Sequence, residues 1–312
     1  MVFKVLIVVS PPLLFAKVTS STTVNYVKPF AASSCSDVQR SCLTLNEYAS
    51  DSKVYFVNNT IFYFYPGIHR LDGRLILENL YNLSLRGWPH GDQVVSIRAG
   101  SLTGISLNGS CNIEISSISF VLYDNFTFVV KFEYSESVRL SNISIYGNGY
   151  HGCSSIISKE SALDFDNARF IGIKGFIGAV VMMLTSKITF RGNSLFVGNT
   201  AYSGGCIYLA NSRLNLNGAS RFLNNTSMNF SQMVINKTVI SCNYNISMSN
   251  IKLLQLKMGG GAIFCDNSYL RIYNFSNFTD NTAMWDGGAA ILNSCSLNIQ
   301  GNVAFVSNEA YH

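Results

Sequence analysis

One pattern of apolar residues returns along most of this 312-residue chain at nearly constant spacing. Its first position holds Leu83, Ile113, Val138, Leu163, Ile188, Leu214, Leu270 and Leu297, in steps of 30, 25, 25, 25, 26, 56 and 27 residues. A second column follows two residues later, at Leu85, Ile115, Leu140, Phe165, Phe190, Leu216, Ile272 and Ile299. Alternation with period two indicates strands with one buried face, and the long period indicates stacked, equivalent units.

The second half of each repeat has its own signature. A phenylalanine precedes an asparagine by three residues in the pairs Phe196/Asn199, Phe222/Asn225, Phe278/Asn281 and Phe305/Asn308. Glycine pairs before a small residue follow at 204–206, 260–262 and 287–289, and the register extends back to 178–179 and 152–153. We expect the phenylalanines to stack on one another. The asparagines should form a hydrogen-bonded ladder at a turn, where asparagine tolerates a left-handed conformation.

These repeats predict an all-β fold, a right-handed parallel β-helix with coils of about 25–27 residues. Each coil would hold two or three short strands that pair with the coils above and below. A leucine-rich repeat has a similar period and is the rival fold. The later repeats lack the leucine frame, however, and no coil has room for an amphipathic helix, so the pattern favours the β-helix.

The repeat pattern also sets the expected boundaries. Residues 22–78 should form an N-terminal cap and first coil, with a strand, a Pro-Gly turn and a second strand in the segment FYFYPGIHRL, and 79–312 should form the repeats. Residues 226–258 fall within the 56-residue step and are either a degenerate coil or a loop insertion; their position favours the loop. The chain stops where the next glycine pair is due, so we expect a truncated C-terminus.

The N-terminal segment and the sequons indicate export. Residues 1–21 contain Lys4, an apolar stretch and small residues, as in a secretory signal peptide; the stretch is too short to span a bilayer. Twelve asparagines begin N-x-Ser/Thr triplets and are candidate glycosylation sites: Asn58, Asn82, Asn108, Asn125, Asn142, Asn224, Asn225, Asn229, Asn236, Asn245, Asn274 and Asn277. Sequons within strands would stay unmodified where the side chain faces inward.

Eight cysteines in an exported chain predict disulfides. Cys35 and Cys42 are close in the sequence and form the first expected pair. Cys242 and Cys265 form a second candidate pair. The cysteines lack a C-x-x-C motif, so nothing in their spacing indicates a metal site, and we expect no cofactor.

The charge of the chain argues against nucleic acid as a partner. The formal net charge is +5, and two lysines lie in the leader, so 5 − 2 leaves about +3 for the remaining residues. This charge is small and dispersed, unlike the concentrated basic patch of a nucleic-acid-binding protein. No later stretch is long and apolar enough to predict a membrane span.

The Phe-x-x-Asn and Gly-Gly-Ala/Cys units at 179–310 resemble the repeats of polymorphic outer-membrane proteins, which are autotransporter passengers. More broadly, the coils resemble the pectate-lyase-like superfamily of right-handed β-helices. Residues 79–178 match only the strand pattern of these relatives. The resemblance implies extracellular binding or adhesion, or processing of polysaccharides, and a fold by itself does not choose between them.

Asp164 and Asp166 are the strongest catalytic candidates. Glycan-cleaving enzymes need clustered acids, and residues at i and i+2 of a strand share a face. The repeat register, however, aligns Asp164 with Arg139 and, one coil further, with Glu114, and it aligns Asp166 with Arg191. We therefore expect charge ladders that stabilise the sheet and hold both carboxylates in their charged form, whereas a general acid must be protonated.

His151 is the remaining candidate. It lies in GYHGCSS, which resembles the G-H-G segment of polygalacturonase-like enzymes, although Tyr150 replaces the first glycine. The repeat register instead assigns residues 151–153 to an ordinary Gly-Gly-small corner. Cys206 likewise lacks a histidine partner in the pattern and is expected to be a small buried residue rather than a nucleophile.

These observations favour a secreted or cell-surface glycoprotein that acts as a non-catalytic interaction or adhesion scaffold. Its partner would be an extracellular glycan or protein, with exposed aromatic residues such as Tyr273 available to stack on sugars. The first alternative is a polysaccharide lyase or glycoside hydrolase, which an acidic cluster on one outer face would favour. The second is a surface receptor with an anchor beyond residue 312.

Overall fold

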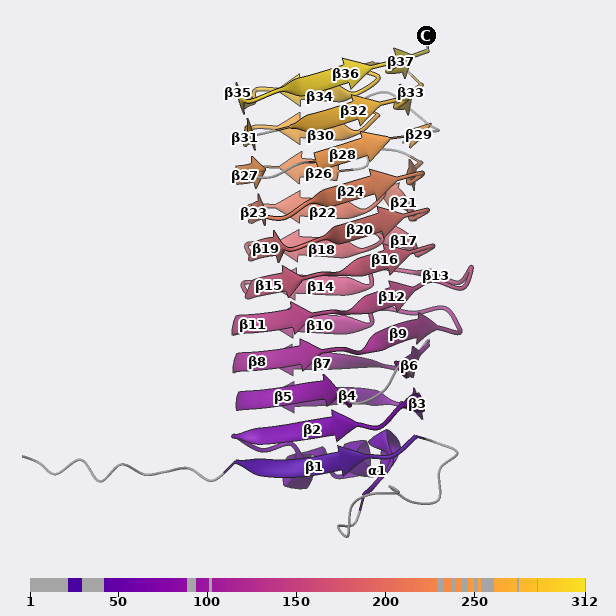
Figure 1. The fold of residues 1–312 in the computed structure, drawn as a ribbon, viewed down its shortest axis with the longest axis vertical. Helices are drawn as coiled ribbons and strands as arrows, with labels where there is room; N and C mark the ends of the chain where they lie inside the picture. Colours follow the sequence, from indigo (N-terminus) through magenta and orange to yellow (C-terminus); the bar gives the residue numbers. More distant parts are fainter. Residues whose placement is uncertain are drawn as a thin grey trace, which may run out of the picture.

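The computed structural model describes residues 22–29, 42–88, 94–100, 103–228, 233–236, 239–242, 246–249, 252–253, 261–273, 275–284 and 286–311. In these ranges the chain winds into a stack of rungs, and successive rungs pair through parallel strands (Figure 1). The strands form four sheets that run along the stack, here named A to D. The parallel β-helix predicted from the repeats is therefore confirmed.

The strand bounds follow the repeat. Sheet A contains β1 (Thr23–Val27), β2 (Thr60–Phe64), β5 (Tyr81–Gly87), β8 (Cys111–Ser116), β11 (Glu136–Ser141), β15 (Ala162–Asp166), β19 (Lys187–Arg191), β23 (Arg213–Leu216), β27 (Val239–Cys242), β31 (Tyr269–Tyr273) and β35 (Ser296–Gln300). Sheet B contains β3 (Gly67–Arg70), β6 (Val95–Ala99), β9 (Ser119–Leu122), β12 (Ser144–Tyr146), β16 (Arg169–Ile171), β20 (Ser194–Val197), β24 (Ser220–Leu223), β28 (Ile246–Ser249), β32 (Ser276–Thr279) and β36 (Val303–Val306).

The other two sheets are shorter. Sheet C contains β4 (Arg74–Glu78), β7 (Gly104–Asn108), β10 (Val130–Glu133), β14 (Ile156–Lys159), β18 (Val181–Leu184), β22 (Ile207–Ala210), β26 (Met233–Asn236), β30 (Ile263–Asp266) and β34 (Ala290–Asn293). Sheet D contains β13 (His151–Gly152), β17 (Lys174–Ile177), β21 (Thr200–Ser203), β25 (Thr226–Ser227), β29 (Lys252–Leu253), β33 (Thr282–Ala283) and β37 (Glu309–Ala310).

The prediction of a loop at residues 226–258 is wrong, because the described strands of this segment form one more coil. Strands β26, β27 and β28 pair on both edges with the coils before and after them. Ile240 is the Cα partner of both Leu214 and Leu270, so the 56-residue step divides into steps of 26 and 30 residues. The sequence pattern missed this coil because Met248 stands where the neighbouring coils carry phenylalanine.

A column of large side chains runs inside sheet B. Its members are successive Cα partners from rung to rung: His69, Ile97, Phe120, Ile145, Phe170, Phe196, Phe222, Met248, Phe278 and Phe305. The Phe196 and Phe222 rings stack with centroids 4.3 Å apart and an interplanar angle of 7°. Both are fully buried. The expected phenylalanine stack is confirmed.

The buried asparagine ladder is also confirmed, although its conformation differs from the expectation. The Asn199 backbone amide donates to Asn225 Oδ1 at 2.8 Å, and the Asn225 side-chain amide donates to the Phe196 carbonyl at 2.9 Å. The positive φ belongs to the preceding residue, at Gly198 and Asn224. The left-handed residue makes the bend, and the next asparagine then points inward to satisfy backbone groups in the interior.

A second buried polar column lies at the bend from sheet C into sheet A, where the sequence analysis gave no prediction. The Ser110, Ser135, Ser161 and Ser186 amides each donate to the hydroxyl of the equivalent serine one rung further on, at 3.0–3.3 Å. Each hydroxyl also donates to the carbonyl two residues before it, for example Ser161 to Lys159 at 2.8 Å. The column therefore satisfies backbone groups at a turn that water does not reach.

Two short helices cover the N-terminal end of the stack, as Figure 1 shows for α1 (Leu45–Ser50); α2 is Ser52–Tyr55. A capping box begins α1, with the Thr44 hydroxyl accepting from the Glu47 amide and the Glu47 carboxylate accepting from the Thr44 amide. Hydrogen bonds to the carboxylate from the Thr44 backbone amide and from the Thr44 hydroxyl lower the pKa of Glu47. Tyr48 and Phe56 contact the Phe62 ring with centroids 5.2 and 4.4 Å away, so aromatic packing closes the interior.

Substitution of Phe222 by aspartate should abolish folding. The change places a carboxylate in a fully buried aromatic column, and even Phe→Ala in a core costs about 3–5 kcal/mol, a large part of a domain's total stability of about 5–15 kcal/mol. Chemical denaturation followed by circular dichroism measures the effect. The matched control is Arg221→Asp on the exposed face of the same strand, which should fold. A cooperatively folded Phe222→Asp protein would contradict the column.

His69 makes stability depend on pH. The ring is buried, packs against Phe64 and donates from Nε2 to the Tyr65 carbonyl at 2.8 Å. Burial lowers its pKa below the ordinary value, only partly offset by hydrogen bonds to the Tyr65 and Lys28 backbone. The unfolded chain takes up a proton as the pH falls through about 6.5, and the folded chain resists it.

The contribution of His69 to the free energy of unfolding should therefore be fully present above pH 6.5 and decline as the pH falls below that value. Denaturant titrations between pH 5 and 8 measure this slope. His69→Gln removes the titration while keeping a side-chain donor, so the slope near pH 6 should shrink. An equal slope in wild type and His69→Gln would exclude this role for His69.

Candidate functional site

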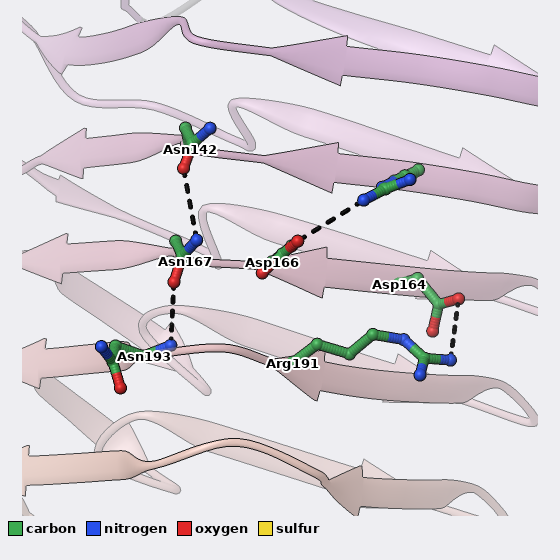
Figure 2. A network of polar contacts seen from close by, with 7 residues as sticks. Asn142, Asp164, Asp166, Asn167, Arg191 and Asn193 are labelled. Atoms are coloured by element: carbon green, nitrogen blue, oxygen red, sulfur yellow. Dashed lines mark hydrogen bonds and ion pairs between the residues drawn. The ribbon is translucent and has the colours of Figure 1, made fainter.

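Asp164 and Asp166 project from β15 on the outer face of sheet A. Asp164 is the Cα partner of Arg139 and Asp166 is the Cα partner of Arg191, as the repeat register predicts. The ion pairs nevertheless cross between the columns. Arg139 Nη2 lies 3.5 Å from Asp166 Oδ2, and Arg191 Nη2 lies 3.5 Å from Asp164 Oδ2 (Figure 2).

The pairing is diagonal because an arginine side chain is long enough to reach the carboxylate two residues along the neighbouring strand. A third pair joins Arg86 Nη2 to Glu114 Oε2 at 2.6 Å. These groups are partly exposed, and an exposed ion pair contributes about 0.2–1 kcal/mol. Glu114, Asp164 and Asp166 therefore each have a cationic partner, which is an arrangement for sheet stabilisation and not for delivering a proton.

Asparagines at the next turn form a parallel row beside the ion pairs. The Asn167 side-chain amide donates to Asn142 Oδ1 at 3.4 Å, and Asn167 Oδ1 accepts from the Asn193 backbone amide at 2.9 Å (Figure 2). Asn142 and Asn167 have positive φ. The left-handed asparagines expected at turns are therefore present here, on the outside of the coil.

His151 lies apart from the aspartates. It belongs to β13 in sheet D, whereas Asp164 and Asp166 belong to sheet A (Figure 1). The predicted equivalence of residues 151–153 with the Gly-Gly corner is wrong, because His151 is the Cα partner of Lys174 on β17. The side chain is exposed, and the His151 backbone amide donates to Asn125 Oδ1 at 3.1 Å. The three catalytic candidates from the sequence do not form one site.

Cys206 is fully buried, as expected, and its sulfur accepts a 3.5 Å hydrogen bond from the Asn199 side chain. The partly buried Cys153 thiol has its pKa raised by burial, which disfavours the reactive thiolate. Neither cysteine has the environment of a nucleophile.

A shallow groove of about 380 Å³ lies on the outer face of sheet A near the N-terminal end of the stack. Its floor carries an amide row in which Asn112 donates to Asn82 at 2.7 Å and Asn82 donates to Asn59 at 2.9 Å. The other lining side chains include Ser84, Ser137, Glu114 and Arg139. We name this feature the amide groove. It offers closely spaced amide, hydroxyl, carboxylate and guanidinium groups.

An aromatic patch adjoins the amide groove on the same sheet face, composed of Tyr26, Tyr63, Tyr65 and Trp88. Trp88 stacks on Tyr65 with centroids 4.7 Å apart, Tyr63 meets Trp88 edge-on at 5.8 Å, and Tyr26 lies 6.1 Å from Tyr63. Tyr26, Tyr63 and Trp88 are partly exposed. Tyr63 lies two residues from Ile61 of the groove and is the Cα partner of Arg86, which pairs with Glu114.

The repeat pattern in the sequence does not predict this patch, although YFVNNTIFYFYP and LRGW contain several aromatic residues. The signal was available in the register, since Tyr26, Tyr63 and Arg86 occupy one outward column. The side chain of Tyr273, proposed from sequence as a sugar-stacking residue, lies outside the described residues.

The structure gives the exposure of eight of the twelve sequon asparagines. Asn58, Asn125, Asn142, Asn224 and Asn277 are exposed, Asn82 and Asn108 are partly buried, and Asn225 is fully buried. Asn229, Asn245 and Asn274, together with the Asn236 side chain, lie outside the described residues. A glycan on Asn225 would require the amide nitrogen that donates to the Phe196 carbonyl, in a place without room for a sugar.

We predict that, in folded protein produced in a host that adds N-linked glycans, Asn225 is unmodified and Asn277, exposed on β32, is accessible to glycosylation. Glycopeptide mass spectrometry in an Asn224→Gln background separates Asn225 from the adjoining sequon. Full occupancy of Asn225 in folded protein would contradict the buried asparagine ladder.

The disulfide arrangement corrects one sequence prediction. Cys265 of β30 bonds to Cys295, with Cα atoms 6.2 Å apart, so the candidate pair Cys242–Cys265 is wrong. Cys242 belongs to β27 in sheet A, between Leu216 and Ile272, whereas Cys265 is in sheet C. Cys42 is disulfide-bonded. Its expected partner Cys35, like the predicted signal peptide 1–21, lies outside the described residues, so that pairing stays a prediction.

Two comparisons with known proteins found no relative of this chain. No protein-family model matches the chain, and a search of curated proteins finds no match. Among the described residues, no helix has the length and apolarity needed to cross a membrane. In the same part of the chain, no three side chains of His, Cys, Asp or Glu gather as potential metal ligands.

Proposed function

We propose that this protein is a secreted or cell-surface, glycosylated and non-catalytic adhesion scaffold that binds an extracellular glycan across the amide groove and the aromatic patch. We further propose a place among pectate-lyase-like β-helices with repeats related to polymorphic outer-membrane proteins. The observation that carries the binding proposal is the adjacency of the groove and the patch on one face of sheet A.

The chemistry of a sugar suits both parts of this face. Sugar hydroxyls donate and accept hydrogen bonds, and the amide groove presents both kinds of partner from Asn82, Asn112 and Ser84 within one cavity. The C–H face of a pyranose is apolar and packs on aromatic rings, for which the partly exposed Trp88 and Tyr63 are available. A rigid sheet holds these groups in place before the ligand arrives, which lowers the entropic cost of binding.

The surrounding charges favour binding over cleavage. Glu114 is paired with Arg86, and Arg139 at the groove edge is paired with Asp166. Hydrolysis of a glycoside needs one protonated and one ionised carboxyl group flanking the bond, and a groove whose acid is ion-paired lacks that division of roles.

The test is retention and cleavage of a panel of neutral and acidic polysaccharides by the folded, secreted protein, with and without calcium. We expect retention without cleavage. Trp88→Ala and Tyr63→Ala should each weaken retention about tenfold, which corresponds to about 1.4 kcal/mol. The matched control is Tyr123→Ala, an exposed tyrosine after β9, which should bind normally. Circular dichroism verifies that each variant is folded.

Two outcomes would reject the proposal. Cleavage that disappears in Asp164→Ala would make the protein a polysaccharide-degrading enzyme with its site at the ion pairs. Absence of retention across the panel, or retention unaffected by both aromatic variants, would remove the groove and patch as a glycan site.

A further inference from the structure

An exposed apolar stripe runs along the outer face of sheet D. Its members are Phe176, Tyr202, Met228, Met284 and Tyr311, which are 57%, 43%, 41%, 48% and 55% exposed. Parallel pairing of β17 with β21, β21 with β25 and β33 with β37 aligns them in one column. The corresponding position of the intervening coil, residue 254, lies outside the described residues.

The stripe is long and regular. Its inward neighbours Ala201, Ser227 and Ala283 are buried, so the alternation in these short strands fixes the stripe on the outside. Adjacent rungs of a parallel sheet lie about 4.8 Å apart, so five steps from Phe176 to Tyr311 span about 24 Å. A contiguous row of exposed large apolar side chains is typical of a protein contact surface.

The ring geometry suits a protein surface as the occupant. Phe176 and Tyr202 stack with centroids 5.2 Å apart and an interplanar angle of only 5°. Each ring therefore covers a face of the other, and the column presents ring edges and methionine side chains to the outside. Apolar side chains of another protein pack against such edges and thioethers.

The period of the stripe favours a second copy of this chain. Side chains spaced about 4.8 Å apart can stay in contact along the whole stripe with a second row of side chains that has the same spacing. A second copy of the chain supplies such a row. Two-fold contacts are the commonest form of self-association, and they require a self-complementary surface. None of the sequon asparagines lies in a strand of sheet D.

The charges beside the stripe indicate its orientation in such a contact. Lys174 and Glu309 occupy the same outward column, separated by β21, β25, β29 and β33. In an antiparallel contact whose two-fold axis crosses between β25 and β29, Lys174 of each copy meets Glu309 of the other. The same arrangement places Tyr202 against Met284 and Phe176 against Tyr311. A parallel contact would instead oppose Lys174 to Lys174.

We propose that two copies of this chain associate side by side, antiparallel, through the sheet D stripe. The contact is one narrow sheet wide and about 24 Å long, which makes its area smaller than the roughly 1,200–2,000 Å² of a stable specific interface, so the association should be weak. We therefore expect a reversible dimer whose population rises with protein concentration. This inference is independent of glycan binding, because the amide groove and aromatic patch lie on sheet A.

Analytical ultracentrifugation of the folded, secreted protein over a range of concentrations tests the dimer. Tyr202→Lys should raise the dissociation constant at least tenfold. The matched control Ile76→Lys, at a 51% exposed position on β4 of sheet C, should not change it. Lys174→Glu should weaken the dimer, and the double variant Lys174→Glu/Glu309→Lys should restore it. Circular dichroism shows that each variant remains folded.

Cysteine crosslinking tests the orientation. Tyr202→Cys/Met284→Cys should form intermolecular disulfides under mild oxidation, beyond any seen in wild type, and Tyr202→Cys alone should not. Crosslinking by Tyr202→Cys alone would contradict the antiparallel contact. A monomer at every concentration, or a dimer unaffected by Tyr202→Lys, would overturn the proposal. Binding of monomeric protein to phosphatidylcholine vesicles that Tyr202→Lys abolishes would overturn it also, and would assign the stripe to a lipid surface.

Discussion

Parallel pairing between consecutive rungs is the interaction on which the whole molecule depends. A strand inside the stack satisfies its backbone groups with the coil before it and the coil after it, and a shift by one residue would turn every inward side chain outward. Each position therefore meets its own equivalent in the next coil. The fully buried rings of Phe196 and Phe222, 4.3 Å apart, show how closely this brings like residues together.

Buried polar columns make that register specific. An apolar column tolerates exchanges, as Met248 between Phe222 and Phe278 demonstrates. The Asn199–Asn225 ladder and the serine column through Ser135 and Ser161 are more demanding, because each hydrogen bond joins a given side chain to a given backbone amide one coil away. A slipped coil would leave those amides unsatisfied in the interior, at a cost of about 1–3 kcal/mol each. The polar columns thus select one alignment, and the apolar columns supply most of the stabilisation.

The sequence predicts this architecture well where equivalent residues repeat and poorly where function depends on side-chain direction. The inward columns through Leu163 and Phe165 appear in the sequence because burial restricts them to apolar residues. The coil at 226–258 escaped detection because one methionine and a 30-residue step replaced the usual markers. The diagonal ion pairs of Asp164 and Asp166 depend on arginine length and direction. The aromatic patch and the sheet D stripe are outward columns, where substitution is freer and the repeat signal correspondingly weak.

A disulfide engineered at positions equivalent to Cys265 and Cys295 in an earlier pair of coils would test the rung-to-rung register directly. Ser158 occupies the same inward column as Cys265. Ser186 is the residue of its coil that corresponds to Cys295 in a later coil. The two serine hydroxyls already lie 3.0 Å apart. Disulfide mapping of the Ser158→Cys/Ser186→Cys double variant by mass spectrometry should therefore find a new bond between residues 158 and 186 in folded protein. A folded double variant in which these two cysteines stay unbonded under oxidising conditions would contradict the register on which the structure rests.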